Sequence, residues 1–311
     1  MPETIGIATA AIRAKSDEAW RRLVEKTIDF YAEALFNPHW GEQLSFQRGD
    51  VLSVQMVFHS LTREQAEAVW SPFFDWVRSA AEDFELVSAP QIFAAPGRRI
   101  WDPSTLRQAP GFVVADDRPG APEGNIFYAG NLGEAGQVLH AYQSAWLPAS
   151  LLEPGARERL VEALIAASRL WRVTLHVNKG LAGGRPEVVD AVRETAMNPA
   201  VAEAFALVIS AAGEQPAYPG VVGHDPDVAN AQAQAAAVTA AMDKIRGVTP
   251  RVGSYVLETD FFQPDWQEAF WGENYPRLRA IKDKYDPEGL FFLHHGVGSE
   301  DWSEDGFVRL Q

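Results

Sequence analysis

Histidine side chains are the groups of this sequence best suited to moving a proton near neutral pH. None of them stands in an HExxH motif or at another metal-ligand spacing with a carboxylate, so we expect no metal site. The chain has no cysteine, which excludes thiolate ligands, disulfides and a cysteine nucleophile. It also has no GxSxG, Walker A or GxGxxG motif, so a self-contained hydrolase or nucleotide-binding site is unsupported. The seven histidines are His39, His59, His140, His176, His224, His294 and His295.

The segment from Asn37 to Gln43 is the densest polar and aromatic cluster in the first half of the chain. Its His39 or Glu42 could face a ligand at the mouth of a sheet. The interpretation that we favour is a turn between a helix and a strand, with Asn37 capping the helix and Trp40 in the core.

Residues 172–181 are expected to form a strand with one polar face. Strand alternation puts Thr174, His176 and Asn178 on one side and three aliphatic side chains on the other. A polar face of this kind either meets solvent, which we favour, or lines a polar cavity. Tyr128 is a further candidate proton donor or acceptor, although an isolated tyrosine more often serves only in packing.

Composition restricts the class of protein. The chain has 311 residues, with 42 Asp and Glu against 27 Lys and Arg, which argues against binding nucleic acid or an anionic membrane. It has no apolar stretch long enough to cross a bilayer, and its first residues lack the pattern of a signal peptide, so we expect a cytoplasmic protein. The 17 Phe and 10 Trp suit a large core and a pocket for a flat small molecule.

The pattern of elements predicts an α+β fold, with an antiparallel sheet that carries helices on one face. Ser16 opens an amphipathic helix that ends before Asn37 and Pro38. Thr62 and Gln65 form a capping box that opens a second helix, which runs to about residue 80. A long loop is expected from Pro96 to about Gly133. Other expected elements are a hairpin over 43–60, helices from Pro154 and over 226–246 and 273–285, and strands over 84–88, 90–95, 172–181, 204–211 and 251–260.

An ordered series of motifs occupies the last part of the chain. It comprises SYVLETD at 254–260, Trp266, FWGENYPRL at 270–278, Lys282, YDP at 285–287 and Phe291. This series resembles the berberine and berberine-like segment of FAD-linked oxidases in the vanillyl-alcohol oxidase superfamily. The stretches NPHWGEQ, LHVNKGLAG and TAMNPAV also resemble the substrate domain of bacterial members, so the resemblance extends over essentially the whole chain.

The resemblance implies an FAD-dependent oxidoreductase that transfers a hydride from a small alcohol, phenol or sugar-like substrate to flavin. It divides the chain into a substrate domain over 1–250 and a C-terminal segment over 251–311 that packs on a flavin-binding domain. The residues implied on the cofactor side are Tyr255, Asn274 and Tyr275, with His294 and His295 at the cofactor edge; a partly exposed histidine pair without a ligand is the alternative. The candidate proton acceptors are Tyr128, His176 and Glu258.

Two departures from the family pattern affect these expectations. Leu257 stands where many relatives have Asn, which removes one polar contact to the cofactor. The family's N-terminal half, which carries the phosphate-binding loop and the residue that can tether FAD, has no counterpart in this sequence. We therefore expect the flavin-binding domain on a separate part or chain, with a homo-oligomer as another way to complete the site. The alternatives are a flavin-free binding or cyclising protein and an inactive truncated fragment.

Overall fold

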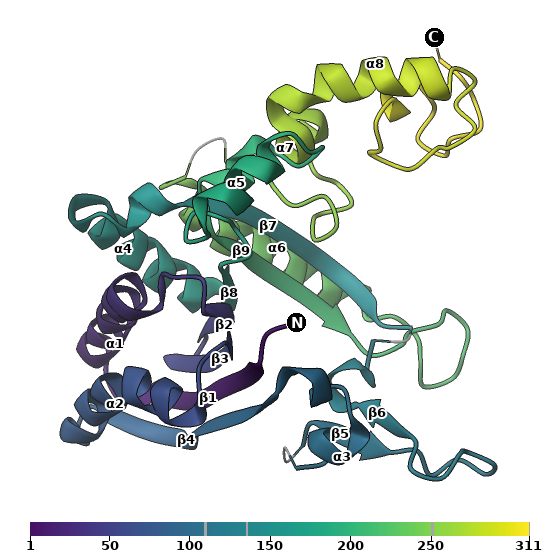
Figure 1. Cartoon of the computed structure of the whole chain (residues 1–311). Coiled ribbons are helices and arrows are strands. Elements are labelled where there is room, and N and C mark those ends of the chain that lie inside the picture. The colour runs from purple at the N-terminus through teal and green to yellow at the C-terminus, as the bar shows by residue number, and fades with distance from the viewer. Residues whose placement is uncertain (109–110, 135, 250–251, 311) are drawn as a thin grey trace.

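The centre of the molecule is a seven-stranded antiparallel sheet with strand order β4-β1-β3-β2-β8-β9-β7. The computed structural model describes the chain except residues 109–110, 135, 250–251 and 311. The expected α+β class and antiparallel sheet are confirmed (Figure 1). The sheet strands are β1 (Thr4–Ala14), β2 (Trp40–Gln47), β3 (Val51–His59), β4 (Phe84–Pro96), β7 (Val138–Pro148), β8 (Val173–Val177) and β9 (Ala204–Glu214).

Four large helices share a hydrophobic core with one face of the sheet. Every second residue of β1 and β3 points into this core, as the buried pair Ala8 and Met56 shows. Trp20 and Trp70 are completely buried there, and burial of such large side chains contributes most of the stabilisation of the core. These helices are α1 (Asp17–Phe30), α2 (Arg63–Ser79), α4 (Pro154–Leu170) and α6 (Val228–Arg246).

The helix boundaries follow from local capping groups. The Ser16 hydroxyl accepts a hydrogen bond from the backbone of Ala19, and Thr62 and Gln65 form the expected capping box. After α1 the chain makes a π-helical turn over Tyr31–Leu35 before it reaches Asn37. None of the helices in the described part of the chain has the length and apolarity that crossing a bilayer requires.

The opposite face of the sheet is covered at the β7 and β9 side. A smaller apolar cluster forms there around Trp146, Leu207 and Ile209, and Tyr255 from the C-terminal segment packs against it. Helix α5 (Pro186–Arg193) contributes the partly buried Val192. The expectation of helices on one face therefore describes the four large helices, whereas α5 and the C-terminal segment lie on the other face.

Several expected elements are corrected by the structure. Strand β1 lies in a segment for which no strand was expected, and the two expected strands over 84–95 are the single strand β4. The expected strand over 251–260 is wrong, because only an isolated bridge joins Tyr255 and Glu258 in its described part. The loop expected from Pro96 contains helix α3 (Pro103–Leu106) and the paired strands β5 (Val113–Ala115) and β6 (Ile126–Tyr128).

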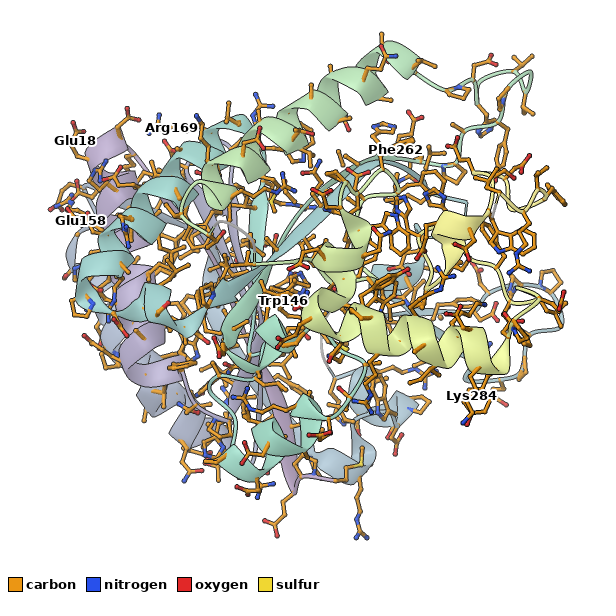
Figure 2. The ribbon with its side chains drawn as sticks, turned by 90° about the horizontal axis from the view of Figure 1, so that it is seen from above. Glu18, Trp146, Glu158, Arg169, Phe262 and Lys284 are labelled. Atoms are coloured by element: carbon orange, nitrogen blue, oxygen red, sulfur yellow. The ribbon has the colours of Figure 1, made fainter. Side chains whose placement is uncertain are left out.

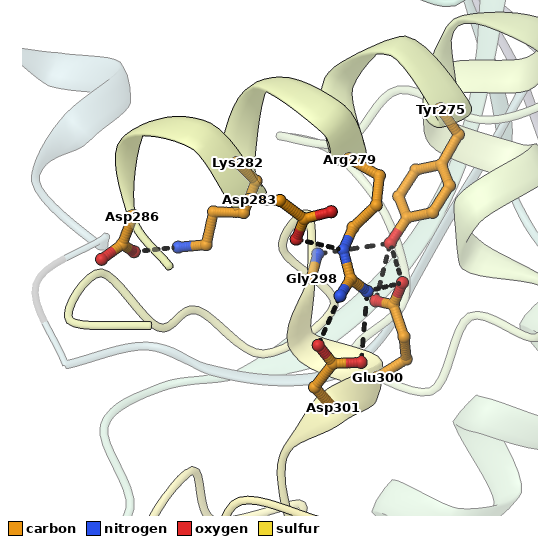
Figure 3. Close-up of polar contacts among 8 residues, drawn as sticks. All are labelled: Tyr275, Arg279, Lys282, Asp283, Asp286, Gly298, Glu300 and Asp301. Atoms are coloured by element: carbon orange, nitrogen blue, oxygen red, sulfur yellow. Dashed lines mark hydrogen bonds and ion pairs between the residues drawn. The ribbon is translucent and has the colours of Figure 1, made fainter. Parts of the chain in front are cut away.

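The C-terminal segment extends away from the sheet as α7 (Trp266–Trp271), α8 (Tyr275–Tyr285) and an irregular tail (Figure 1). Arg279 holds the tail to α8, because its guanidinium donates to Glu300 at 2.8 Å and also to Asp283 and Asp301 (Figure 3). The Tyr275 hydroxyl donates to Glu300 at 2.6 Å and accepts from the backbone of Gly298 at 3.2 Å. The expected domain boundary at 250 and 251 lies outside the described residues.

Candidate functional site

Four side chains, which we call the charged cluster, lie at the end of β8 on the sheet face opposite the large helices: Glu42, His176, Lys179 and Glu258. His176 lies on that face, as alternation predicts, but the favoured expectation that this face meets solvent is wrong, because the imidazole of His176 and the side chain of Thr174 are mostly buried. Its Nδ1 lies 3.4 Å from a carboxylate oxygen of Glu42 in β2. The interaction with His176 lowers the pKa of Glu42 below its usual value, and the charge of Lys179 acts in the same direction. Glu42 adopts a left-handed backbone (φ 71°), which is uncommon for a glutamate.

Lys179 links this pair to the C-terminal segment. Its ammonium forms an ion pair with Glu258 and lies 5.3 Å from the centre of the Tyr255 ring. About a third or less of each of the two charged side chains is exposed, at 30% for Lys179 and 27% for Glu258. The ion pair therefore joins the end of β8 to the turn that begins the berberine-like motif.

Three residues of β7 interact with this turn: Tyr142, Ser144 and Trp146. The ring centroids of Trp146 and Tyr255 are 5.9 Å apart, and Figure 2 shows Trp146 between the sheet and the C-terminal segment. Burial and the charge of Glu258 together raise the pKa of Tyr142 to about 12, so this phenol stays protonated. The Ser144 hydroxyl accepts from the backbone N–H of Tyr255 at 3.2 Å.

A column of stacked rings forms a second candidate region within the C-terminal segment. The Phe261 and His294 rings stack with centroids 4.0 Å apart, His294 and His295 follow at 3.9 Å, and Trp266 ends the column. These rings line a cavity of about 450 Å³ together with the exposed Phe262, which Figure 2 labels. Burial and the neighbouring His294 lower the pKa of His295, which favours its neutral form.

Asn274 and Tyr275, the other two residues expected beside the cofactor, make hydrogen bonds inside the protein. The Asn274 amide donates to the carbonyl of Met197 at 2.7 Å, which ties the start of α8 to the segment before β9. Tyr275 uses its hydroxyl on Glu300 and Gly298, as described above. Burial and the hydrogen bond to Glu300 raise the pKa of Tyr275, so it remains a phenol.

The structure thus brings some of the predicted residues together and separates others. Lys179 brings Glu258 and Tyr255 together, and His176 contacts Glu42 on the same sheet face. Tyr128 lies apart in β6, where its ring contacts Phe112. His294 and His295 lie in the aromatic column. Within the described ranges, no group of three or more His, Asp or Glu side chains is placed to hold a metal ion.

The sequence analysis did not single out Lys179. It named Glu42 as a possible ligand-facing residue, but it favoured a purely structural turn for that segment. The lysine directly follows the polar face of β8, so its position was a usable signal. The left-handed backbone conformation of Glu42 could not be predicted from the sequence, because glutamate has no preference for that conformation.

Comparison with known proteins gives matches of two kinds. Residues 254–298 match the family described as "Berberine and berberine like". The FAD-linked oxidoreductase ZEB1 of Gibberella zeae is 55% identical over 67 residues, which are 21% of this chain and 12% of that protein. The FAD-linked oxidoreductase notD' of Aspergillus versicolor is 58% identical over 57 residues, which are 18% of this chain and 9% of that protein.

Solved structures match over nearly the whole chain. The VAO-type flavoprotein MtVAO713 from Myceliophthora thermophila C1 aligns with a TM-score of 0.65 and 16% identity, covering 98% of this chain and 50% of that one. MtVAO615 from the same organism aligns with a TM-score of 0.66 and 18% identity, covering 97% of this chain and 48% of that one. This chain therefore spans about half the length of these structures.

The fold is thus that of one half of the VAO-type flavoproteins. Residues 254–298 thus form a berberine-like segment on a chain with this fold, and short stretches of the chain are similar to FAD-linked oxidoreductases.

Proposed function

We propose that this chain forms the substrate-domain half of an FAD-dependent oxidoreductase. The observation that carries the proposal is the ion pair between Lys179 and Glu258, which joins the berberine-like segment to the polar end of β8. The ion pair lies beside the ring of Tyr255, on the sheet face that the large helices leave uncovered and that also carries His176. The relatives named as FAD-linked oxidoreductases support the same assignment.

The cluster is suited to accepting a proton from a substrate hydroxyl. FAD, when bound, supplies the acceptor for a hydride from a substrate carbon, which must accompany loss of that proton. Glu42 beside Nδ1 of His176 favours a proton on that nitrogen, so Nε2 is the atom that accepts. Glu258 is the second candidate acceptor, and the protonated Tyr142 is a hydrogen-bond donor to a substrate oxygen.

The residues expected to hold FAD fit that role unequally. The cavity beside the stacked His294 and His295 rings suits a flat ring system, because aromatic faces line it. Tyr255 presents a ring beside the charged cluster. Asn274 and Tyr275 are engaged in internal hydrogen bonds, so their role in this proposal is to hold α8 and the tail in place.

A flavin-binding domain is the partner that this proposal requires. Apolar side chains of the tail are strongly exposed, with Leu290 at 80% and Phe291 at 76%. Exposed apolar groups that are close together mark an interaction surface. The similar solved structures are about twice as long as this chain, so each of them contains a further part of about the size of a domain. The substrate is a small organic alcohol, phenol or sugar-like molecule.

The test is the visible flavin absorbance of the purified chain after addition of FAD and desalting, alone and with a VAO-type flavin-binding domain. We expect flavin to be retained with that domain, and substrate-dependent bleaching to follow. His176→Ala and Glu258→Gln should slow bleaching strongly, whereas His224→Ala, a change in an exposed loop, should not. A protein that stays colourless in both experiments would contradict the proposal and favour a flavin-free role, for which the exposed Leu257 in place of the family's Asn is an argument.

A further inference from the structure

Asn178 immediately follows β8 and makes hydrogen bonds with every polar group of its side chain. Its Oδ1 accepts from the Tyr31 hydroxyl at 2.9 Å. Its Nδ2 donates to the carbonyl of Asn37 at 3.1 Å and to the carbonyl of Trp40. Its backbone N–H donates to the carbonyl of Phe205 in β9 at 2.7 Å. The side chain of Asn178 therefore connects the end of β8 to the π-helical turn and to the start of β2, and its backbone connects it to β9.

The buried Tyr31 fixes the direction of this amide. Its side chain is inaccessible to solvent, and burial raises the pKa of its phenol, so the hydroxyl can act as a donor. A donor facing Asn178 selects the oxygen of the amide, which leaves the nitrogen for the two carbonyls. The π-helical turn begins at Tyr31, and the Tyr31 hydroxyl lies within hydrogen-bond distance of Asn178 at the end of β8.

The connections of Asn178 lead to both halves of the charged cluster. His176 lies two residues before it and Lys179 directly follows it. Of the two carbonyls that its Nδ2 binds, that of Asn37 precedes β2, and that of Trp40 belongs to the first residue of β2, two residues before Glu42. Asn178 has a left-handed backbone (φ 56°), a conformation that asparagine adopts more readily than most residues. The side chain thus adds a link between the segment that carries Glu42 and the segment that carries His176 and Lys179, next to the β2–β8 pairing that sets Glu42 opposite Val177.

We propose that Asn178, oriented by the Tyr31 hydroxyl, is the positioning residue of the charged cluster. It touches none of the reacting groups, and it acts by holding Glu42 against His176 and by aiming Lys179 at Glu258. The role of this geometry in oxidation rests on the proposed function, but the geometry itself does not. Its test therefore begins with a measurement that needs neither flavin nor substrate.

The measurement is the pKa of the Glu42 carboxyl, followed by NMR in the chain labelled with carbon-13 at glutamate, with Glu42→Gln identifying the signal. Tyr31→Phe removes only the hydroxyl, and Asn178→Gly removes the amide while keeping access to a positive φ. In both variants the pKa of Glu42 should rise from its lowered value toward the ordinary value of about 4.3. Thr27→Val is the matched control, because it removes a buried hydroxyl of α1 that donates to the carbonyl of Leu23 and is remote from Asn178 in the hydrogen-bond network.

A pKa of Glu42 that stays as low in Tyr31→Phe as in Thr27→Val would overturn the proposal. The Tyr31→Phe variant decides the matter by itself where Asn178→Gly fails to fold. In the complex with a flavin-binding domain, Tyr31→Phe should also shift the pH profile of flavin reduction, while Thr27→Val should leave it unchanged. A shifted pKa without any flavin reduction in the parent chain would keep the positioning role and reject the oxidoreductase function instead.

Discussion

At the scale of single residues, the charged cluster combines groups whose protonation states depend on one another. Tyr142 has a pKa of about 12, because burial and the charge of Glu258 both disfavour the phenolate. Glu42 has a lowered pKa, because His176 and Lys179 favour its carboxylate. At neutral pH Glu42 is therefore a carboxylate and Tyr142 a phenol, so the same sheet face carries a proton acceptor and a proton donor.

Neutralising Glu258 should lower the pKa of Tyr142. Glu258→Gln removes the negative charge that disfavours the phenolate, but it leaves the burial of the ring unchanged. We expect the pKa to fall below about 12 and to stay above the ordinary tyrosine value of about 10. The ultraviolet titration of tyrosinate, with Tyr142→Phe to identify the transition, measures this shift. An unchanged transition in Glu258→Gln would show that the carboxylate does not act on Tyr142.

The contribution of Glu42 to stability should depend on pH in a defined direction. Its pKa is lower in the folded protein than in the unfolded chain, so its stabilising effect is present above the unfolded value of about 4.3. That effect is lost as the pH falls through the lower folded value. Urea unfolding of the parent and Glu42→Gln should differ at pH values near neutrality and converge in acid. Equal free energies of unfolding near neutrality would contradict this linkage.

At the scale of elements, the sequence was informative where capping or alternation determines the structure locally. The hairpin of β2 and β3 and the Thr62 capping box follow from such local patterns. Strand β1 was missed because its core-facing residues are mostly small alanines, which give a weak strand pattern. The strand expected over 251–260 is interrupted at Gly253, whose φ of 73° lies outside the extended region and which no pattern of side chains announces.

The charged cluster was predictable only in part, because only some of its contacts lie within one local sequence pattern. Alternation along β8 correctly placed His176 on the polar face, since that pattern lies within one strand. The meeting of Lys179 with Glu258 depends on where a segment 79 residues later in the sequence packs, which no local pattern encodes. Tyr128 was a candidate by residue type alone, and the structure places it in the separate small sheet.

The tail of the C-terminal segment should depend on Arg279. Its guanidinium reaches three carboxylates in the planar geometry that lysine cannot reproduce, and Figure 3 shows these contacts. In Arg279→Lys we expect amide hydrogen exchange over 298–302 to become about tenfold faster, which corresponds to about 1.4 kcal/mol of local stability. Arg277→Lys, an exposed position on the same helix, is the control. Equal exchange in the two variants would remove Arg279 from this role.

At the scale of the whole molecule, the sheet and its helices form a core that does not depend on the C-terminal tail. The four large helices and one face of the sheet share a continuous apolar cluster, which contains no residue of α8 and none of the described residues after it. The tail instead displays apolar side chains to solvent beyond α8 (Figure 1). A segment that is costly to expose and that is not required by the core is best explained by a partner surface.

Replacing apolar residues of the tail should therefore separate folding from association. In the variant Leu290→Ser, Phe291→Ser and Leu293→Ser, we expect the melting temperature to stay nearly unchanged, because these side chains are 68–80% exposed and add little to the folded chain. The same variant should lose its binding to a VAO-type flavin-binding domain, measured by sedimentation velocity, and should retain less flavin after desalting. Val87→Ser and Val188→Ser, at apolar positions that are also exposed but lie outside the tail, provide the control. If the triple variant still binds the flavin-binding domain, the partner surface lies elsewhere on the molecule. If its melting temperature falls strongly, the tail instead contributes to the stability of the chain itself.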